Sequence, residues 1–289
     1  MRSAAVAAAA VAAVAIGATT TTAATSPAPP PGPSAHAPAN PLGSAAMRAL
    51  LRSRAGSITA AIYDIRSRHL YAYRRGVQEY EASIAKVDIV AVLLAQAQRR
   101  GALLDPAQQQ LAAASIEQSA NQQTQLLWNE TGYNPAIAAF NASVGMRDTT
   151  LDPAGIWGRY QTTAIDQVIL LDHLVEPNPV LGPAARAYEL GLMRAVVAWQ
   201  AWGVSAGVLA PATVALKNGW APIVGTAGWQ VNSIGWVSGR GRDYLIAVLT
   251  GDDPGYAYGV ATIAAISALV WSELRRAPAP TAGTRRRRR

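Results

Sequence analysis

The spacing of apolar residues near the start of the folded body is the alternation typical of β-strands. In "GSITAAIYDI" the pattern includes Ile58, Ala60 and Ile62, and it resumes at Leu70 and Ala72 in "LYAYRRG". The polar stretch "RSRH" separates the two runs. We therefore expect a β-hairpin in this part of the chain.

A long segment with helical spacing follows. Residues 84–100 hold too many apolar positions for a single stripe, so we expect a helix that is buried on most sides and ends at Gly101. Further helical patterns cover roughly 106–131, 135–144, 164–176 and 184–199.

Strand spacing returns after this helical middle. The runs "TVALKNGW", "WQVNSIGWVSG" and "DYLIAVLTG" are separated by glycine-rich turns, and a helix over about 256–276 follows "GDDPG". We predict an α/β (α+β) fold with one antiparallel sheet built from both chain ends, flanked by terminal helices and carrying an inserted all-helical subdomain. The predicted catalytic domain covers residues 44–277.

Both ends of the chain differ in composition from this body. Residues 1–24 carry an apolar run behind Arg2 that is shorter than the about 20 residues of a membrane span and suits a secretory signal peptide. Small residues near 22–24 or near 34–37 offer cleavage sites, and a retained anchor is the alternative. Residues 25–43 predict a Pro/Ala-rich linker, and residues 278–289 predict a disordered Arg-rich tail. We expect an exported protein, secreted or located in the cell envelope.

The charge of the chain is concentrated in its tail. The formal net charge is +8, but five arginines form the terminal run 285–289. Without that run, 20 basic residues face 17 acidic ones and the charge is +3. A body so close to neutral lacks the basic stripe of a nucleic-acid-binding protein. The tail itself predicts a solubilising end, with weak contact to the anionic cell envelope as the alternative.

Cysteine and histidine usage restricts the chemistry further. The chain has no cysteine, which excludes disulfides, thiolate metal sites and a thiol nucleophile. Its three histidines form no pattern with a serine and an acid that suggests a Ser–His–Asp triad, and no cluster of His, Asp and Glu has metal-ligand spacing. We expect neither a metal nor another cofactor.

Lysine is the rarest residue that can carry a charge in this chain. The chain holds 25 basic residues, and only Lys86 and Lys217 are lysines. Ser83 precedes Lys86 by three positions, which places both side chains on one face of a helix about one turn apart. A lysine whose pKa is depressed can accept the serine proton, whereas arginine stays protonated.

Two further short motifs carry candidate polar residues. Ser119 and Asn121 lie in "SAN" at a predicted helix start, where N-capping is the alternative explanation. Lys217 opens "KNGW" on a predicted strand, where an exposed edge with a bulge is the alternative.

The three motifs occur in the order S-x-x-K, S-x-N and K-x-G, and in this the chain resembles the serine β-lactamase and penicillin-binding protein superfamily, in particular class A β-lactamase-like serine hydrolases. The resemblance covers roughly residues 55–276. It implies that Ser83 is the acylated nucleophile and Lys86 the base that activates it. Ser119 would pass a proton to the leaving nitrogen, Asn121 would hold the substrate amide, and Lys217 would supply positive charge beside them.

The resemblance also assigns the strand motif to substrate binding. Asn218, Gly219 and Trp220 would line the substrate, with the backbone N–H groups of Ser83 and Trp220 forming the oxyanion hole. The chain departs from the family pattern here, because Asn218 stands where the family has a hydroxyl that helps to bind the substrate carboxylate. Its longer amide leaves the choice of substrate open.

A second departure concerns release of the acyl group. Class A β-lactamases carry a glutamate that positions the deacylating water, but no glutamate lies between Glu130 and Glu176. Asp152 lacks the matching motif context, Asp166 in "TAIDQ" resembles a helix capping box, and Gln161 can orient a water but not deprotonate it. We therefore expect acylation to be followed by slow hydrolysis.

The remaining candidates concern the walls of the site and the choice of function. Trp157 and Trp220 are the tryptophans expected near the site, and Arg240 or Arg242 is a candidate for binding a carboxylate, with exposed turn arginines as the alternative. The leading hypothesis is an exported, monomeric serine hydrolase acting on a β-lactam or a related small amide or ester. Its rivals are a penicillin-binding protein that acylates but turns over poorly, and a catalytically silent binding protein of the cell wall.

Overall fold

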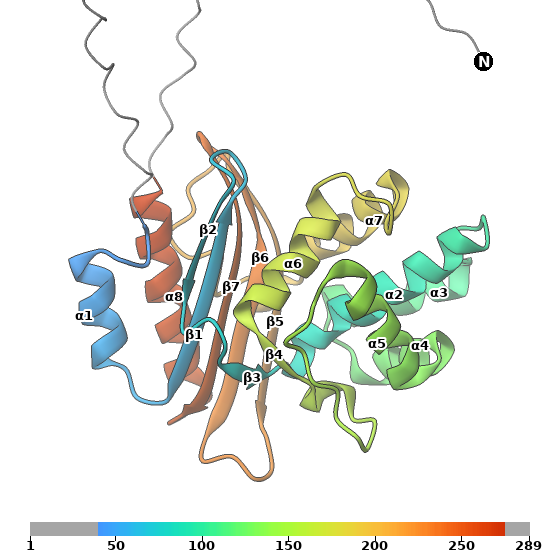
Figure 1. The fold of residues 1–289 in the computed structure, drawn as a ribbon, viewed down its shortest axis with the longest axis horizontal. Coiled ribbons are helices and arrows are strands. Elements are labelled where there is room, and N and C mark those ends of the chain that lie inside the picture. The colour runs from blue at the N-terminus through green and yellow to red at the C-terminus, as the bar shows by residue number, and fades with distance from the viewer. Residues whose placement is uncertain (1–39, 275–289) are drawn as a thin grey trace, which may run out of the picture. The chain divides into compact units, whose positions relative to one another are not determined.

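The computed structural model describes residues 40–274, which contain a five-stranded antiparallel sheet with strand order β2-β1-β7-β6-β5 (Figure 1). The first strands, β1 (Ser57–Asp64) and β2 (His69–Tyr73), form the predicted hairpin. The last three are β5 (Thr213–Pro222), β6 (Trp229–Gly239) and β7 (Arg242–Asp253). Because β1 pairs with β7 along its whole length, both chain ends share one sheet, and the predicted fold class is confirmed.

Two terminal helices cover one face of the sheet. They are α1 (Ala45–Ser53) and α8 (Tyr256–Glu273), and Figure 1 shows both on the same side of the strands. Buried side chains of α8, such as Ile263 and Ile266, belong to one apolar cluster with Ile62 of β1 and Ile246 of β7. Burial of this apolar surface is the main favourable contribution to the packing of the layer.

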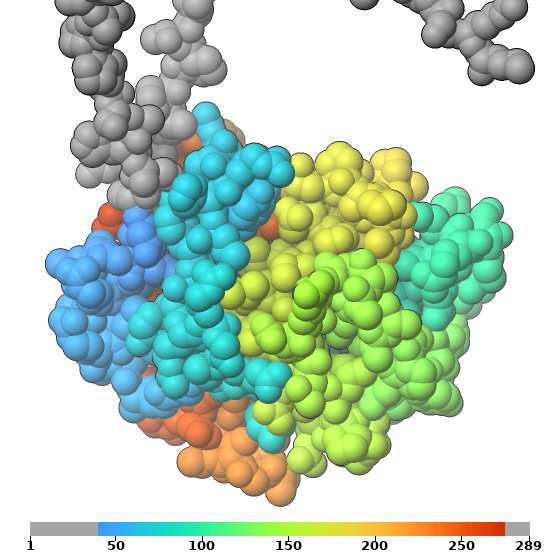
Figure 2. Space-filling view, viewed as in Figure 1, coloured from blue at the N-terminus to red at the C-terminus, as the bar shows by residue number. Residues whose placement is uncertain are grey.

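The opposite face carries the helical subdomain. Its helices are α2 (Ala85–Arg99), α3 (Pro106–Glu117), α4 (Asn121–Thr131), α5 (Tyr133–Val144), α6 (Ala164–Val175) and α7 (Pro183–Arg194). All residues of α2 from Ala85 to Ala95 are buried, as its dense apolar pattern predicts. The space-filling view shows the green and yellow helices packed against the blue and orange sheet region (Figure 2).

Short elements connect these layers. The strands β3 (Gln78–Tyr80) and β4 (Gln161–Thr163) form a separate two-stranded sheet, and three 3₁₀ turns occur at η1 (Ala82–Ile84), η2 (Trp157–Arg159) and η3 (Ala198–Gln200). Because β3 leads directly into η1 and η1 into α2, this connection positions the start of the central helix.

Two helix predictions need correction. The pattern at 106–131 is not one helix, because Ser119 has a φ of 58° and the left-handed backbone there separates α3 from α4. The pattern at 184–199 ends as a helix at Arg194, and only the η3 turn follows.

The predicted signal peptide, most of the predicted linker and the predicted Arg-rich tail lie outside the described residues. Within residues 40–274, no helix combines the length and the hydropathy that crossing a membrane requires.

Candidate active site

Ser83 and Lys86 meet at the junction of η1 and α2. The Nζ of Lys86 donates a hydrogen bond to the Oγ of Ser83 over 2.7 Å. Lys86 is fully buried, whereas Ser83 is half-buried. The residue before the serine, Ala82, has a φ of 49°, an unusual conformation for a residue other than glycine. Backbone strain of this kind is found at active sites, where it holds a reactive side chain in place.

Asn121 joins this pair from the start of α4. Its Oδ1 accepts a second hydrogen bond from the Nζ of Lys86 over 2.9 Å. The residue as a whole is exposed, so its Nδ2 group is left to donate to an oxygen of a bound molecule. The structure therefore brings Asn121 to the position expected of a residue that binds a substrate amide.

The remaining two candidates form a second pair. The Nζ of Lys217 donates to the Oγ of Ser119 over 3.0 Å and to the carbonyl of Asn218 over 2.8 Å. Ser119 adopts the left-handed conformation noted above, which directs its side chain toward β5. Thus Ser83, Lys86, Ser119, Asn121 and Lys217, which are spread over three distant segments, come together in one site.

Burial changes the acid–base properties of both lysines. Desolvation disfavours the charged amine and lowers the pKa of Lys86 to about 7. The pKa of Lys217 is also lowered, first by burial and then by the charge of Lys86. A substantial fraction of Lys86 is therefore neutral near pH 7, and its contact with Ser83 then allows the serine hydroxyl to donate its proton to the amine.

Gly219 allows β5 to approach the backbone around Ser83. A Cβ at this position would lie 2.6 Å from the carbonyl oxygen of Glu81 and 2.7 Å from the backbone N of Ser83. Since such distances are too short for a carbon atom, only glycine permits this approach. The backbone of β5 beside Gly219, including the N–H of Trp220, is thereby brought next to the backbone of Ser83, where the oxyanion hole is predicted.

The amide of Asn218, predicted to bind the substrate, is engaged in hydrogen bonds within the protein. Successive side chains of a strand point to opposite faces, so Asn218 points away from the face on which Lys217 lies. Its side chain is fully buried, and the Nδ2 donates to the carbonyls of Gln200 over 2.7 Å and of Trp202 over 3.2 Å. Asn218 therefore holds the segment after η3 against β5.

Gln200 is a supporting residue that the sequence patterns did not indicate. It is fully buried, and its Nε2 donates to the carbonyl of Gln118 over 3.0 Å, directly before Ser119. Through Asn218 and Gln118, Gln200 links the strand motif to the Ser119 segment. The one signal in the sequence is a polar residue inside the aromatic stretch "AWQAW".

The two tryptophans expected near the site have different surroundings. The Nζ of Lys86 lies 4.4 Å from the ring centroid of Trp157, so the indole covers the amine directly. Trp220 lies in an aromatic group, with ring centroids 6.1 Å from Trp199, 5.9 Å from Trp202 and 5.7 Å from Tyr256. Trp199 is 67% exposed, and this group forms an aromatic surface next to the strand motif.

Asp152 and Asp166, the two acids considered for deacylation, form no hydrogen bond or ion pair with Lys86 or Lys217 among the described residues. The carboxylate of Asp152 lies 3.4 Å from the Nε of Arg159 and accepts from the backbone N of Ala154. Asp166 accepts from the backbone N of Asp148 and from the hydroxyl of Thr149, so its carboxylate does not close the predicted capping box.

The other half of that box is present, because the side chain of Thr163 accepts from the backbone N of Asp166. Gln161 lies in β4, where it pairs with Tyr80 and with Thr150 through its backbone. None of the three candidates from this loop hydrogen-bonds to Ser83 or Lys86 among the described residues.

Two buried acids near the nucleophile were missed. Glu81 and Asp88 flank the Ser83–Lys86 segment, and both are almost completely inaccessible to solvent. Burial, together with the charges of Asp88 and Asp166, raises the pKa of Glu81 well above its usual value. Burial also raises the pKa of Asp88 to about 8. The signal was present, because "EASIAKVD" places two acids within an otherwise apolar run.

Arg240 and Arg242, the two arginines considered for binding a substrate carboxylate, donate hydrogen bonds to backbone carbonyls of the protein. The guanidinium of Arg240 donates to the carbonyl of Ala210 over 2.5 Å. The guanidinium of Arg242 donates to the carbonyl of Trp271 over 2.8 Å, and its Cζ lies 4.2 Å from the centroid of the indole ring of Trp271. Arg240 is exposed, in agreement with the alternative considered for turn arginines, whereas Arg242 is half-buried.

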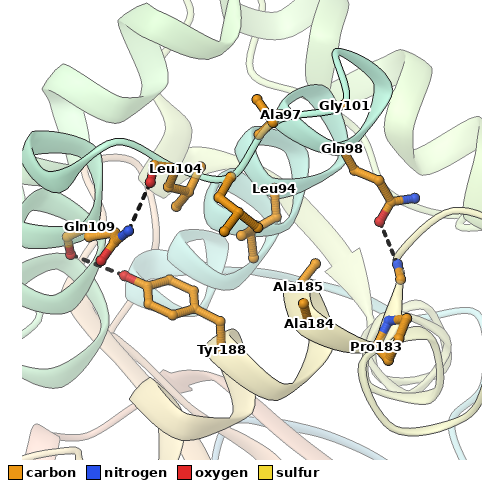
Figure 3. A pocket seen from close by; sticks show the side chains of 13 residues that line it. Leu94, Ala97, Gln98, Gly101, Leu104, Gln109, Pro183, Ala184, Ala185 and Tyr188 are labelled. Carbon is orange, nitrogen blue, oxygen red and sulfur yellow. Dashed lines mark hydrogen bonds between the residues drawn. The ribbon is translucent and has the colours of Figure 1, made fainter.

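A pocket of about 510 Å³ lies between α2, α3 and α7 (Figure 3), and neither of the two lysines belongs to its lining. Its walls are mainly apolar, and the polar groups of Gln98, Gln109 and Tyr188 are engaged in hydrogen bonds within the protein. The pocket offers no nucleophile or base, so the reactive groups identify the site at Ser83 instead. Among the described residues, no three His, Asp or Glu side chains are grouped so as to hold a metal ion.

Comparison with known families gives an independent result. The model of the "Beta-lactamase enzyme family" matches residues 104–274, more than half of the chain. The matched region includes Ser119, Asn121 and Lys217 and begins after Ser83 and Lys86. The comparison with curated proteins gives no significant match.

Several solved structures share the fold. A class A beta-lactamase from Bacteroides cellulosilyticus DSM 14838 has a TM-score of 0.69 and 18% identity, over 78% of this chain and 94% of that chain. A beta-lactamase from Chitinophaga pinensis DSM 2588 has a TM-score of 0.69 and 16% identity, over 79% and 97%. An ancestral class A beta-lactamase has a TM-score of 0.67 and 23% identity, over 78% and 97%.

Proposed function

The chain belongs to the beta-lactamase enzyme family, and from this premise we propose that it is a serine hydrolase that forms an acyl-enzyme on Ser83. The proposed substrates are β-lactams or related small amides and esters. The observation that carries the proposal is the 2.7 Å contact between the Oγ of Ser83 and the Nζ of Lys86. Burial lowers the pKa of this amine to about 7.

We propose that acylation takes place in three steps. The neutral amine of Lys86 takes the proton of Ser83 as the Oγ attacks the substrate carbonyl carbon. The negative charge that develops on the carbonyl oxygen is stabilised by the backbone N–H groups of Ser83 and Trp220. The C–N or C–O bond then breaks, and Ser119, which is hydrogen-bonded to Lys217, gives its proton to the leaving atom while it receives the proton that Lys86 removed from Ser83.

We propose that Asn121, Lys217 and Trp220 position the substrate. The Nδ2 of Asn121 donates to an amide oxygen of the substrate while its Oδ1 stays bound to Lys86. Lys217 provides positive charge that favours a negatively charged substrate group near Ser119. Trp220 and the aromatic surface beside it provide apolar contacts.

Release of the acyl group is proposed to be slow. Hydrolysis requires a base to activate a water, and neither Asp152 nor Asp166 bonds to Ser83 or Lys86 among residues 40–274. The face of Lys86 that is not used by Ser83 and Asn121 is covered by Trp157. These contacts favour the penicillin-binding alternative, in which the acyl-enzyme accumulates.

The location of the protein is part of the proposal. The composition of residues 1–24 supports export by a signal peptide to the cell envelope or beyond it. We place the protein there as a monomer. The Arg-rich tail is proposed to make weak contacts with anionic polymers of the envelope.

The test is a time course with a chromogenic reporter penicillin, followed by intact mass and by colour. Early appearance of an adduct that persists would support slow release, and fast product formation without an adduct would support an efficient β-lactamase. Ser83→Ala is expected to abolish both signals. If the protein forms no adduct and its ester hydrolysis is unchanged in Ser83→Ala, the serine hydrolase proposal fails.

A further inference from the structure

Lys86 has an apolar neighbour where a third polar group would be expected. Its buried amine contacts the Oγ of Ser83 and the Oδ1 of Asn121, and the third contact is the ring of Trp157 at 4.4 Å. The ring face provides no acceptor for the proton of a water molecule. A water molecule on this side of the amine would have to displace the indole.

The indole is held in this position by its own hydrogen bond. The Nε1 of Trp157 donates to the Oε1 of Gln125 on α4 over 3.1 Å. This bond turns the polar edge of the ring toward α4, so that the apolar face remains over Lys86. The N–H group therefore is not available to orient a water at Ser83.

The loop that carries Trp157 is fastened on both sides. Thr150 and Gln161 exchange two backbone hydrogen bonds of 2.7 and 2.9 Å at its base. Within the loop, Asp152 forms an ion pair with Arg159 over 3.4 Å, and its carbonyl accepts from the Nδ2 of Asn134 on α5 over 2.8 Å.

A second set of contacts fastens the loop to the helices. The hydroxyl of Tyr160 donates to the Oδ1 of Asn134 over 2.7 Å and accepts from the Nε1 of Trp128 over 2.9 Å. A Cβ at Gly155 would lie 3.1 Å from the ring of Trp128, so the loop packs closely against α4. These contacts hold the loop in place and keep the ring of Trp157 beside Lys86.

We propose that Trp157 is a positioning residue whose indole ring excludes water from the Ser83–Lys86 pair, so that an acyl group on Ser83 is long-lived. The part of this inference that concerns the acyl group rests on the proposed function. The part that concerns the exclusion of water from Lys86 does not, because it can be measured without a substrate.

The indole acts on Lys86 in two opposing ways. A cation–π contact favours the ammonium form, which would raise the pKa of Lys86. The removal of water favours the neutral amine and lowers the pKa, and desolvation is the effect that dominates at Lys86. Removal of the indole would let water reach Lys86, and we therefore expect the pKa of Lys86 to rise.

The chain allows a direct measurement of this effect. Because Lys86 and Lys217 are the only lysines, lysine labelled with ¹³C at Cε gives two side-chain signals for NMR, and a Lys217→Arg variant assigns them. We expect Trp157→Ala to raise the titration midpoint of Lys86 by about 1 pH unit. We expect Trp157→Phe, which keeps an apolar ring, to move it much less.

Ile156 offers a matched control, because it is the neighbouring residue and is 46% exposed. Ile156→Ala should leave the Lys86 midpoint unchanged. If Trp157→Ala folds, as judged by its circular dichroism, and the midpoint stays where it is in the unaltered protein, Trp157 does not exclude water and the inference is overturned. An equal shift in Ile156→Ala would also overturn it, because the effect would then belong to the loop as a whole.

The lifetime of the acyl group is the second measurement. After exposure to the reporter penicillin and removal of the excess, we expect the Ser83 adduct to disappear at least about 10-fold faster in Trp157→Ala than in the unaltered protein. Gln125→Ala, which removes the bond that orients the indole, should give an intermediate rate.

The two failures are distinguishable. Equal adduct lifetimes in Trp157→Ala and the unaltered protein contradict the inference and leave the proposed function intact. If the unaltered protein forms no adduct at all, the proposed function fails, and the lysine titration still decides whether Trp157 shields Lys86.

Discussion

Single residues explain why a chain so rich in arginine contains two lysines. Both lysines are fully buried and both donate to a serine hydroxyl, at 2.7 Å for Lys86 and at 3.0 Å for Lys217. Burial disfavours a charged side chain, and a lysine amine can respond by losing its proton, whereas an arginine cannot. The rarity of lysine in the sequence therefore pointed to two positions that the structure buries beside serine hydroxyls.

The first prediction concerns the pH dependence of acylation. Because the pKa of Lys86 is about 7, its amine is mostly protonated at lower pH and mostly neutral at higher pH. We expect the single-turnover acylation rate to rise as pH increases through about 7 and then to level off, as measured by stopped-flow with the reporter penicillin.

Lys86→Arg tests whether the rise of the acylation rate with pH is due to the titration of Lys86. The variant keeps a positive charge but not a removable proton, so we expect acylation to fall by about 10²–10⁴-fold. A variant that retained both the rate and the rise with pH would show that another group acts as the base.

The strand motif shows the limit of this reasoning at the residue scale. A motif gives the order of Lys217, Asn218 and Gly219, but the pleat of β5 gives their directions. Lys217 and Gly219 face the helical subdomain, whereas Asn218 bonds to the carbonyls of Gln200 and Trp202. Its amide partners lie in a distant loop, which no local pattern could indicate.

At the scale of elements, the site depends on the close approach of β5 to η1. Gly219 makes this approach possible, since the atoms nearest to an added Cβ are backbone atoms of Glu81, Ser83 and Ile84. Backbone atoms cannot turn aside as a flexible side chain can. Any side chain at this position must therefore move one of the two elements.

The second prediction follows for Gly219→Ala. Separating β5 from η1 should cost about 1–3 kcal/mol of the free energy of unfolding and displace the oxyanion hole, with acylation reduced by about 10²-fold. Urea denaturation and the stopped-flow rate measure the two effects. Gly76→Ala is the control, because no atom lies within 4 Å of its added Cβ, and it should change neither quantity.

The long elements were predictable because each has many apolar positions at a clear spacing. The hairpin β1–β2, the meander β5–β7 and the buried helix α2 all appear where the patterns placed them. The strands β3 and β4 were missed because three residues each are too few to show a period. The break between α3 and α4 lies inside the helical pattern at 106–131, where only the interpretation of "SAN" as a helix start indicated it, and the left-handed backbone of Ser119 marks its position.

At the scale of the whole molecule, the site exists because the sheet joins both chain ends. Ser83 and Lys86 follow the hairpin, Ser119 and Asn121 come from the helical subdomain, and Lys217 lies on β5 beyond it. The order of elements predicted this meeting in outline. It could not predict the cover that Trp157 forms over Lys86, since the loop is positioned by contacts with α4 and α5.

The buried acids below the site affect the stability of the molecule, and Asp88 yields the third prediction. Its pKa is raised to about 8, whereas an unfolded aspartate has a pKa of about 3.9. The folded state thus keeps a proton that the unfolded state has lost. This contribution to stability is complete below about pH 4 and is lost as pH rises through about 8.

Asp88→Asn removes this titration. We expect the fall in the free energy of unfolding between pH 5 and pH 8 to shrink by an amount on the order of 1–3 kcal/mol, measured by urea denaturation at both values. Asp148→Asn, at an exposed carboxylate, should leave the fall unchanged. The same fall in Asp88→Asn and the unaltered protein would show that Asp88 is not the group responsible.

The central claim is that Ser83 is a nucleophile that acquires and retains an acyl group. The most direct measurement is peptide mapping by mass spectrometry after incubation with the reporter penicillin, with Ser83→Ala in parallel. We expect one penicilloyl group on the peptide that contains Ser83, persistent after excess reagent is removed and absent from Ser83→Ala. An unmodified peptide, or the same modification in Ser83→Ala, would contradict the account.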